Sequence, residues 1–113
     1  MRVDVLTLFP GMFAPMHESM MWKAQDRGFL ELATHDIRAW TTDRHRTVDD
    51  TPYGGGGGMV LKVDILTPAI EAVRGESDAP VILMSPQGRV LTHEIAQELS
   101  QHEHMVIVCG HYE

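Results

Sequence analysis

The residues best suited to chemistry lie in one stretch, from Asp43 to Gly58, in which charged residues and a tyrosine lead into five consecutive glycines. Its arginines and histidine offer hydrogen-bond donors and a ring that titrates near neutral pH, and its aspartates offer acceptors. A glycine backbone lets a ligand approach closely, because no side chain stands in the way. A flexible linker would explain the glycines alone, but linkers are seldom preceded by so many charges and an aromatic ring. The stretch therefore predicts a binding site.

Three smaller groups carry residue types that can bind metals or act as nucleophiles. Asp49 and Asp50 could hold magnesium or supply a base, although adjacent carboxylates on a loop are more often only solvated. The run His102–His104 fits a solvated turn better than a zinc site, which needs three or four converging ligands. Cys109, the single cysteine, ends an apolar run and fits a buried, inert thiol. We therefore predict no metal site, with magnesium left open at the aspartate pair.

The composition is that of an ordinary folded domain. The chain has 113 residues, 43% of them hydrophobic and 22% charged, which fits one domain with a real core. No apolar run approaches the roughly 20 residues of a membrane span, and no secretory signal opens the chain, so we predict a cytoplasmic protein without membrane contact. The net charge of −7 counts against a nucleic-acid partner. Arg38, Arg44 and Arg46, in or beside the glycine-rich stretch, nevertheless keep such a partner open.

The common nucleotide-binding motifs are absent from the sequence. No Lys-Ser or Lys-Thr follows Gly54–Gly58, as a P-loop requires. No Gly-x-Gly-x-x-Gly opens a helix after a strand either. P-loop nucleotidases and nicotinamide dehydrogenases are therefore disfavoured.

Strands and helices are expected to alternate along the chain, because apolar runs alternate with apolar positions at helical spacing. One helix would bury Met12 and Met20 and end at Gly28 as its C-terminal cap. A second would start at Thr67 as N-cap, and a third at Thr92. The predicted strands are Arg2–Phe9, Phe29–Thr34, Met59–Val63, Val81–Met84 and Met105–Cys109, of which the last two are wholly apolar and expected to be buried.

Alternation of this kind implies right-handed crossovers between parallel strands, and hence an α/β fold with a parallel sheet flanked by helices. The turns after the strands then open on one edge of the sheet, where ligands bind outside the carboxyl ends. The turns at Pro10–Gly11, Ser85–Arg89 and Gly110–Glu113 would share that edge. We therefore predict that the two glycine-bearing turns after the last two strands form a pocket wall.

Four motifs, in order along the whole chain, carry a resemblance to a known family. They are Leu-Phe-Pro-x-Met-Phe at Leu8–Phe13, Asp-Arg-His-Arg-Thr-Val-Asp-Asp-x-Pro-Tyr-Gly-Gly-Gly at Asp43–Gly56, Ser-Pro-Gln-Gly-Arg at Ser85–Arg89, and Cys-Gly-His-Tyr-Glu at Cys109–Glu113. With them the sequence resembles the bacterial tRNA (guanine-N1)-methyltransferases. The resemblance implies transfer of a methyl group from S-adenosylmethionine to N1 of guanosine 37 in tRNA.

The resemblance also implies roles for individual residues. Methyl transfer needs in-line positioning, and guanine N1 must lose a proton to a base. Glu113 would read the N–H edge of the target guanine, while the general base would lie beyond this sequence. The S-adenosylmethionine pocket would be lined by the backbone around Ser85, Pro86, Gly88, Gly110 and Tyr112. The guanosine and its phosphates would be held by Arg44, His45, Arg46, Asp50, Tyr53, Gly54, Gly55 and Gly56.

The family fold that the resemblance implies is a SPOUT-type methyltransferase domain, a parallel α/β domain with a deep trefoil knot that works as a homodimer. We expect residues 1–113 to be the N-terminal part of that domain, without the knot segment and without a small RNA-binding C-terminal domain. We therefore expect these residues to be inactive alone and their last strand to lack neighbours. A non-catalytic RNA- or nucleotide-binding α/β module and a purely structural fragment stay open as alternatives.

Overall fold

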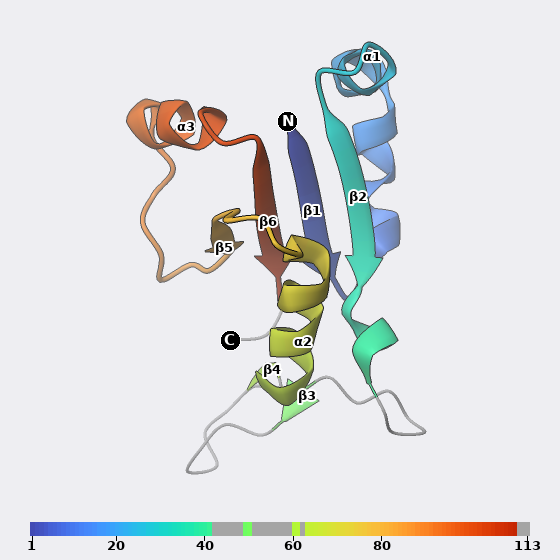
Figure 1. Cartoon of the computed structure of the whole chain (residues 1–113), viewed down its shortest axis with the longest axis vertical. Coiled ribbons are helices and arrows are strands. Elements are labelled where there is room, and N and C mark those ends of the chain that lie inside the picture. Colours follow the sequence, from blue (N-terminus) through green and yellow to red (C-terminus); the bar gives the residue numbers. More distant parts are fainter. Residues whose placement is uncertain (42–48, 51–59, 62, 111–113) are drawn as a thin grey trace.

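The computed structural model describes residues 1–41, 49–50, 60–61 and 63–110, and Figure 1 shows their arrangement. Six strands, two 3-10 helices and three α-helices make up these residues. Strands and helices alternate through most of the chain, as predicted. In order, the elements are β1 (Arg2–Thr7), η1 (Pro10–His17), α1 (Ser19–Asp26), β2 (Glu31–Asp36), η2 (Ile37–Trp40), β3 (Asp49–Asp50), β4 (Val60–Leu61), α2 (Val63–Arg74), β5 (Val81–Leu83), α3 (His93–Ser100) and β6 (His104–Cys109).

The main sheet has four parallel strands in the order β2-β1-β6-β5. Strand β1 pairs along its whole length with β2 on one side and with β6 on the other. The predicted parallel α/β fold is thus confirmed. The expectation that the last strand lacks neighbours is wrong, because β6 lies between β1 and β5.

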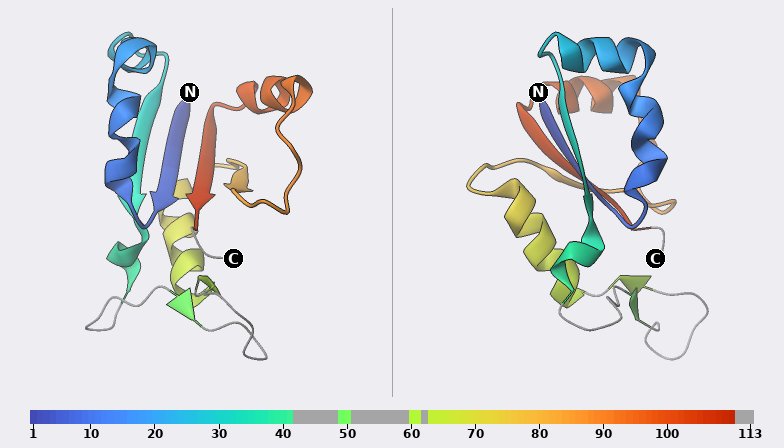
Figure 2. Two further views of the ribbon diagram at one scale, coloured as in Figure 1. Left: turned by 180° about the vertical axis from the view of Figure 1, so that it is seen from behind. Right: turned by 90° about the vertical axis from the view of Figure 1, so that its right-hand side faces the viewer.

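Helices cover both faces of this sheet (Figure 2). On one face, Ile65 and Ala69 of α2 pack against Leu6, Val106 and Val108, which are all fully or almost fully buried. On the other face, Val3, Val5 and Met105 form a second cluster. The first 3-10 helix and α3 pack against this second cluster through Phe13 and Leu99.

The first helical region differs from the single helix that its spacing predicts. Glu18, with φ −123° and ψ 158°, interrupts it and separates the 3-10 helix η1 from α1. Pro15 has no N–H to donate to a helical hydrogen bond. A 3-10 helix has three residues per turn, so the apolar residues predicted at α-helical spacing do not stay on one face. As a result Met12 and Met20 are each 69% exposed, and their predicted burial is wrong.

Capping residues decide where the elements end. Gly28, at φ +78°, donates its N–H to Gln25, and the next residue, Phe29, donates to Ala24, which is a Schellman motif. Because the N–H of Leu30 also bonds to Ala24, β2 begins at Glu31 and not at Phe29 as predicted. The cap predicted at Thr92 is confirmed, since its Oγ1 accepts the N–H of Ile95.

Helix α2 begins earlier than predicted. It starts at Val63 and contains Pro68 in its interior, so Thr67 is not an N-cap. The predicted cap was wrong because the first turn, Val63 to Leu66, forms upstream of the proline and includes the buried Ile65. Its end is as predicted, with Gly75 at φ +62° just beyond Arg74.

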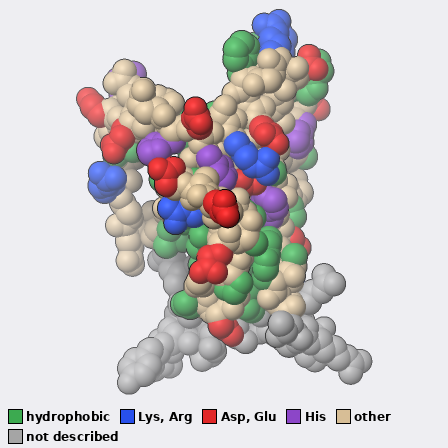
Figure 3. All heavy atoms as spheres, in the orientation of Figure 1, with side chains coloured by type: hydrophobic (Ala, Val, Ile, Leu, Met, Phe, Trp, Pro, Cys, Tyr) green, Lys and Arg blue, Asp and Glu red, His purple; other side chains and the backbone are tan. Residues whose placement is uncertain are grey.

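A fully buried carboxylate, Asp4 on β1, joins three strands. Its Oδ2 accepts from Arg2 Nε at 2.9 Å and from His104 Nε2 at 2.7 Å, and its Oδ1 accepts from His35 Nε2 at 2.7 Å. Figure 3 shows histidine, basic and acidic side chains gathered on this face of the molecule, above the apolar side chains near α2. Burial by itself raises the pKa of Asp4, but the hydrogen bonds from Arg2, His35 and His104 and the charge of Arg2 outweigh it and hold that pKa below its ordinary value.

Replacing Asp4 by Asn should destabilise the full-length protein by about 2 kcal/mol, because it removes the buried charged acceptor that pairs with Arg2, His35 and His104. A lower urea midpoint would report the loss. The matched control is Glu31→Gln, which removes the other carboxylate paired with Arg2. The Glu31 side chain is 69% exposed, and its Oε1 lies 2.6 Å from Arg2 Nη1. That exposed pair should contribute less than about 1 kcal/mol.

The same carboxylate predicts a pH dependence. The pKa of Asp4 is lower in the folded state than in the unfolded state. Its contribution to the free energy of unfolding is therefore present above the unfolded pKa, about 3.9, and is lost as the pH falls toward the folded pKa. The wild-type protein should therefore lose stability on acidification below about pH 4 more steeply than the Asp4→Asn variant. Parallel curves for the two proteins would show that Asp4 is not the group responsible.

Candidate functional site

The carboxyl ends of the four parallel strands meet at one edge of the sheet. Thr7 at the end of β1 pairs with Asp36 at the end of β2 and with Cys109 at the end of β6. Leu83 at the end of β5 pairs with Val108. Ser85 and Gly110 therefore each lie two residues beyond the Leu83–Val108 pair, so the chain leaves β5 and β6 at nearly the same level.

The turn after β5 is built by three small residues. Ser85 Oγ accepts the N–H of Gln87 at 3.1 Å, and its carbonyl accepts the N–H of Gly88 at 3.2 Å. Serine at the first position, proline at the second and glycine at the fourth is a favoured pattern for a type I turn. The N–H of Met84 donates to the Val108 carbonyl at 3.0 Å, which fixes the start of the turn against β6.

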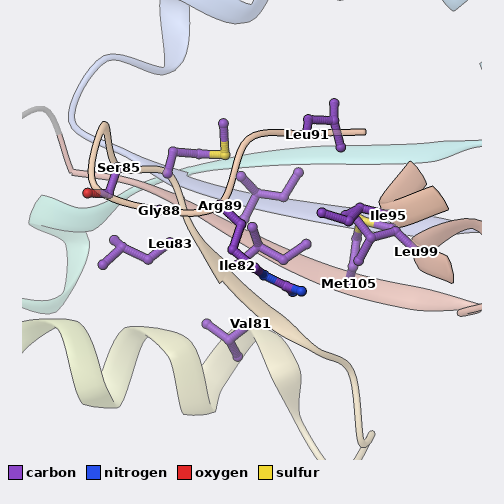
Figure 4. A pocket seen from close by; sticks show the side chains of 12 residues that line it. Val81, Ile82, Leu83, Ser85, Gly88, Arg89, Leu91, Ile95, Leu99 and Met105 are labelled. Atoms are coloured by element: carbon purple, nitrogen blue, oxygen red, sulfur yellow. The ribbon is translucent and has the colours of Figure 1, made fainter. Parts of the chain in front are cut away.

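A cavity of about 530 Å³ lies beside this turn (Figure 4). Helix α3 supplies one wall through Ile95 and Leu99, and the turn supplies another through Ser85 and Gly88. The size falls within the range of small-molecule sites, and mostly apolar walls with a few polar groups are typical of them. The remaining lining residues are Val81, Ile82, Leu83, Met84, Arg89, Leu91, Met105 and Ile107.

Strand β5 borders this cavity and is not buried as its apolar sequence predicts. Val81 is 40% exposed and Leu83 is 61% exposed. The reason is position, because β5 is the edge strand. The buried residues that pack around Ile65 and Ala69, here called the α2 core cluster, include residues of β1 and β6 but, among the described residues, none of β5. A wholly apolar strand that is open to solvent here forms part of a cavity wall.

The structure brings together some of the predicted cofactor residues. Ser85 and Gly88 line the cavity, Pro86 lies between them in the turn, and Gly110 is buried just beyond β6. Ile95, Leu99 and the other apolar wall residues are not among the predicted site residues, although the helical spacing of Ile95 and Leu99 predicts one apolar face. Tyr112 and Glu113 lie outside the described residues.

The predicted guanosine-binding residues are described only in part. Asp50 belongs to β3, which pairs with β4 in antiparallel orientation, Asp50 opposite Val60. This ladder joins residues 49–50 to residues 60–61 and lies beyond the carboxyl ends of the parallel strands (Figure 1). Outside the described residues lie Arg44, His45, Arg46, Tyr53, Gly54, Gly55 and Gly56.

His104 and Cys109, two of the residues considered for metal binding or nucleophilic chemistry, have surroundings that disfavour those roles. His104 uses Nε2 to contact Asp4, and its Nδ1 lies 2.8 Å from Ser77 Oγ. Burial raises the pKa of the half-buried Cys109 thiol, which disfavours the reactive thiolate. In the part of the chain that the structure describes, no three His, Cys, Asp or Glu side chains are grouped to hold a metal ion.

Comparison with known proteins places these features in a family. The family model described as "tRNA (Guanine-1)-methyltransferase TrmD" matches residues 1–113. The chain belongs to this family. The match covers the Ser85–Gly88 turn and both ends of β5 and β6.

Individual family members are similar over the whole chain. Proteins named tRNA (guanine-N(1)-)-methyltransferase are 54% identical in Chloroflexus aurantiacus and 53% identical in Geobacter sulfurreducens, each covering 100% of this chain. The crystal structure of the tRNA (m1G37) methyltransferase from Aquifex aeolicus matches with a TM-score of 0.89 at 33% identity, over 100% of this chain and 52% of that one. This chain spans 46% and 47% of the two curated relatives, about half their length.

Among the helices of the described residues, none combines the length and apolar character needed to cross a membrane.

Proposed function

We propose that this chain is the N-terminal part of a tRNA (guanine-N1)-methyltransferase, which transfers a methyl group from S-adenosylmethionine to N1 of guanosine 37. The observation that carries the proposal is the family match over residues 1–113. It is supported by the position of the Ser85–Gly88 turn, which lies at the carboxyl end of β5 and lines one end of the cavity. Ligands of open parallel sheets bind at this edge. A methyltransferase of this family needs both a methyl donor and tRNA.

S-adenosylmethionine would bind at the cavity beside β5 and α3. The residues present fit this cofactor, because apolar walls can enclose its adenine and the turn offers backbone polar groups. When bound, the cofactor supplies the electrophilic methyl group. Its backbone contacts would come from Ser85, Pro86, Gly88, Gly110 and Tyr112.

The guanosine would lie between this cavity and the glycine-rich segment. Arginines and backbone N–H groups there suit phosphates, and the glycines permit close approach. Glu113 would accept a hydrogen bond from the guanine edge, while a carboxylate beyond residue 113 would take the N1 proton. The residues proposed to hold the guanosine and its phosphates are Arg44, His45, Arg46, Asp50, Tyr53, Gly54, Gly55 and Gly56.

The complete enzyme would be a cytoplasmic homodimer with a SPOUT-type trefoil-knot domain. Residues 1–113 would form the first part of that domain, followed by the knot segment and an RNA-binding C-terminal domain. Support comes from the relatives, of which this chain spans about half. Magnesium, if it takes part, would act at Asp49 and Asp50.

Replacing Gly88 by Ala in the full-length protein tests the cofactor site. The new Cβ would meet the Ser85 carbonyl oxygen at 3.4 Å, so the turn should keep its structure. A methyl group on the cavity wall should nevertheless weaken S-adenosylmethionine binding about tenfold, or about 1.4 kcal/mol by calorimetry. Gly11→Ala is the matched control, since a Cβ there meets nothing within 4 Å. Equal affinity of both variants would place the cofactor elsewhere.

Replacing Glu113 by Gln tests the guanosine side. Because the carboxylate contacts the substrate and not the cofactor, turnover on tRNA should fall about 100-fold while S-adenosylmethionine affinity changes little. Steady-state methyl transfer and calorimetry measure the two effects separately. A matching loss in both measurements would refute the assignment of Glu113 to the guanine.

The isolated 113-residue chain should not methylate tRNA, because under this proposal the base and part of the cofactor pocket would come from a following segment. A radiolabelled methyl-transfer assay on unmodified tRNA measures this directly, with the full-length protein as positive control. Turnover near that of the full-length protein would mean that these 113 residues contain the whole catalytic site.

A further inference from the structure

The short 3-10 helix η2 joins the end of β2 to the glycine-rich segment. Its N-cap is Asp36, whose Oδ1 accepts the N–H of Arg38 at 2.9 Å. Ile37 is fully buried in the α2 core cluster and anchors the helix to the sheet. The C-cap of the helix is Thr41, which donates to the Arg38 carbonyl through its N–H at 3.1 Å and its hydroxyl at 2.8 Å.

The Arg38 side chain reaches from this helix to the turn after β1. Its Nη1 donates to the Leu8 carbonyl at 2.8 Å, and its Cζ lies 6.0 Å from the centre of the Phe9 ring, a cation–π distance. Leu8 and Arg38 are 30 residues apart in sequence. Arg38 therefore ties together two turns that leave the same edge of the sheet.

The geometry points to Arg38 as a positioning residue for the guanosine side of the reaction. Its side chain fixes η2 to the turn after β1, and its carbonyl binds Thr41, which precedes the segment with the proposed guanosine contacts. This inference rests on the proposed function. Arginine suits the task because one planar guanidinium can both donate to a carbonyl and contact an aromatic ring, whereas a lysine ammonium is a point charge.

A direct phosphate contact is the weaker interpretation of the same side chain. Asp36 Oδ1 lies 3.7 Å from Arg38 Nη1 and offsets part of its charge. The side chain is also only 36% exposed. A residue that binds a phosphate would change the salt dependence of tRNA binding, whereas a positioning residue would not.

The test uses Arg38→Met, Arg38→Lys and Phe9→Leu in the full-length protein, with Arg27→Met as matched control. Arg27 is exposed at the end of α1, and only its backbone contributes to the helix cap. We expect Arg38→Met to lower kcat/KM for tRNA about tenfold at saturating S-adenosylmethionine, because small displacements of substrate contacts reduce rates strongly. Cofactor affinity and the salt dependence of tRNA binding should stay at wild-type values, and Arg38→Lys should restore part of the loss.

Phe9→Leu should lower kcat/KM less, and its effect should be non-additive with Arg38→Met, because the two side chains act as one contact. The inference would be overturned by additive losses of kcat/KM in the double variant or by a fully active Arg38→Met. It would equally be overturned if Arg38→Met lost as much cofactor affinity as kcat/KM, or lowered the salt dependence of tRNA binding. Thermal melting shows whether each variant is folded. If Arg38→Met is unfolded, the kcat/KM values of Arg38→Lys and Phe9→Leu decide whether the inference holds. An inactive wild-type protein would instead overturn the proposed function, and this inference with it.

Discussion

The buried carboxylate of Asp4 is the constraint on which the sheet depends. A charge in the interior is costly unless it is paired, and the partners of Asp4 come from β1, β2 and β6. All of them are in place only when the three strands have the observed register. A slip of β1 by one residue would turn Asp4 toward the opposite face, where Val3 and Val5 now pack in an apolar cluster.

This register determines where the candidate site lies. Because β1, β2 and β6 end level with one another, the turns after them meet at one edge, and β5 adds the Ser85–Gly88 turn beside Gly110. The cavity has apolar walls along β5, β6 and α3 and opens at this edge on the polar Ser85–Gly88 turn, and the β3–β4 ladder lies beyond the same edge. The methyl donor and the guanosine are thus proposed to meet at the edge of the sheet where the turns follow the carboxyl ends of the parallel strands.

Local signals in the sequence predicted much of this fold, whereas long-range contacts were not predictable. Gly28 and Thr92 were found as caps because their chemistry acts within a few residues. The spacing of Met12 and Met20 predicts burial, but both are exposed, because spacing alone does not show the break at Glu18. The apolar run around Leu83 predicts burial, but Leu83 is exposed because the strand order places β5 at the edge of the sheet. The Asp4 cluster joins residues up to 100 positions apart, which no local pattern reveals.

The most direct test of the account is a structure of the full-length protein with bound S-adenosylmethionine. The account predicts that the adenosine lies against the backbone of Ser85 to Gly88 and close to Gly110, at the carboxyl edge of β5 and β6. An adenosine bound away from both turns would contradict the claim that this edge of the parallel sheet holds the methyl donor.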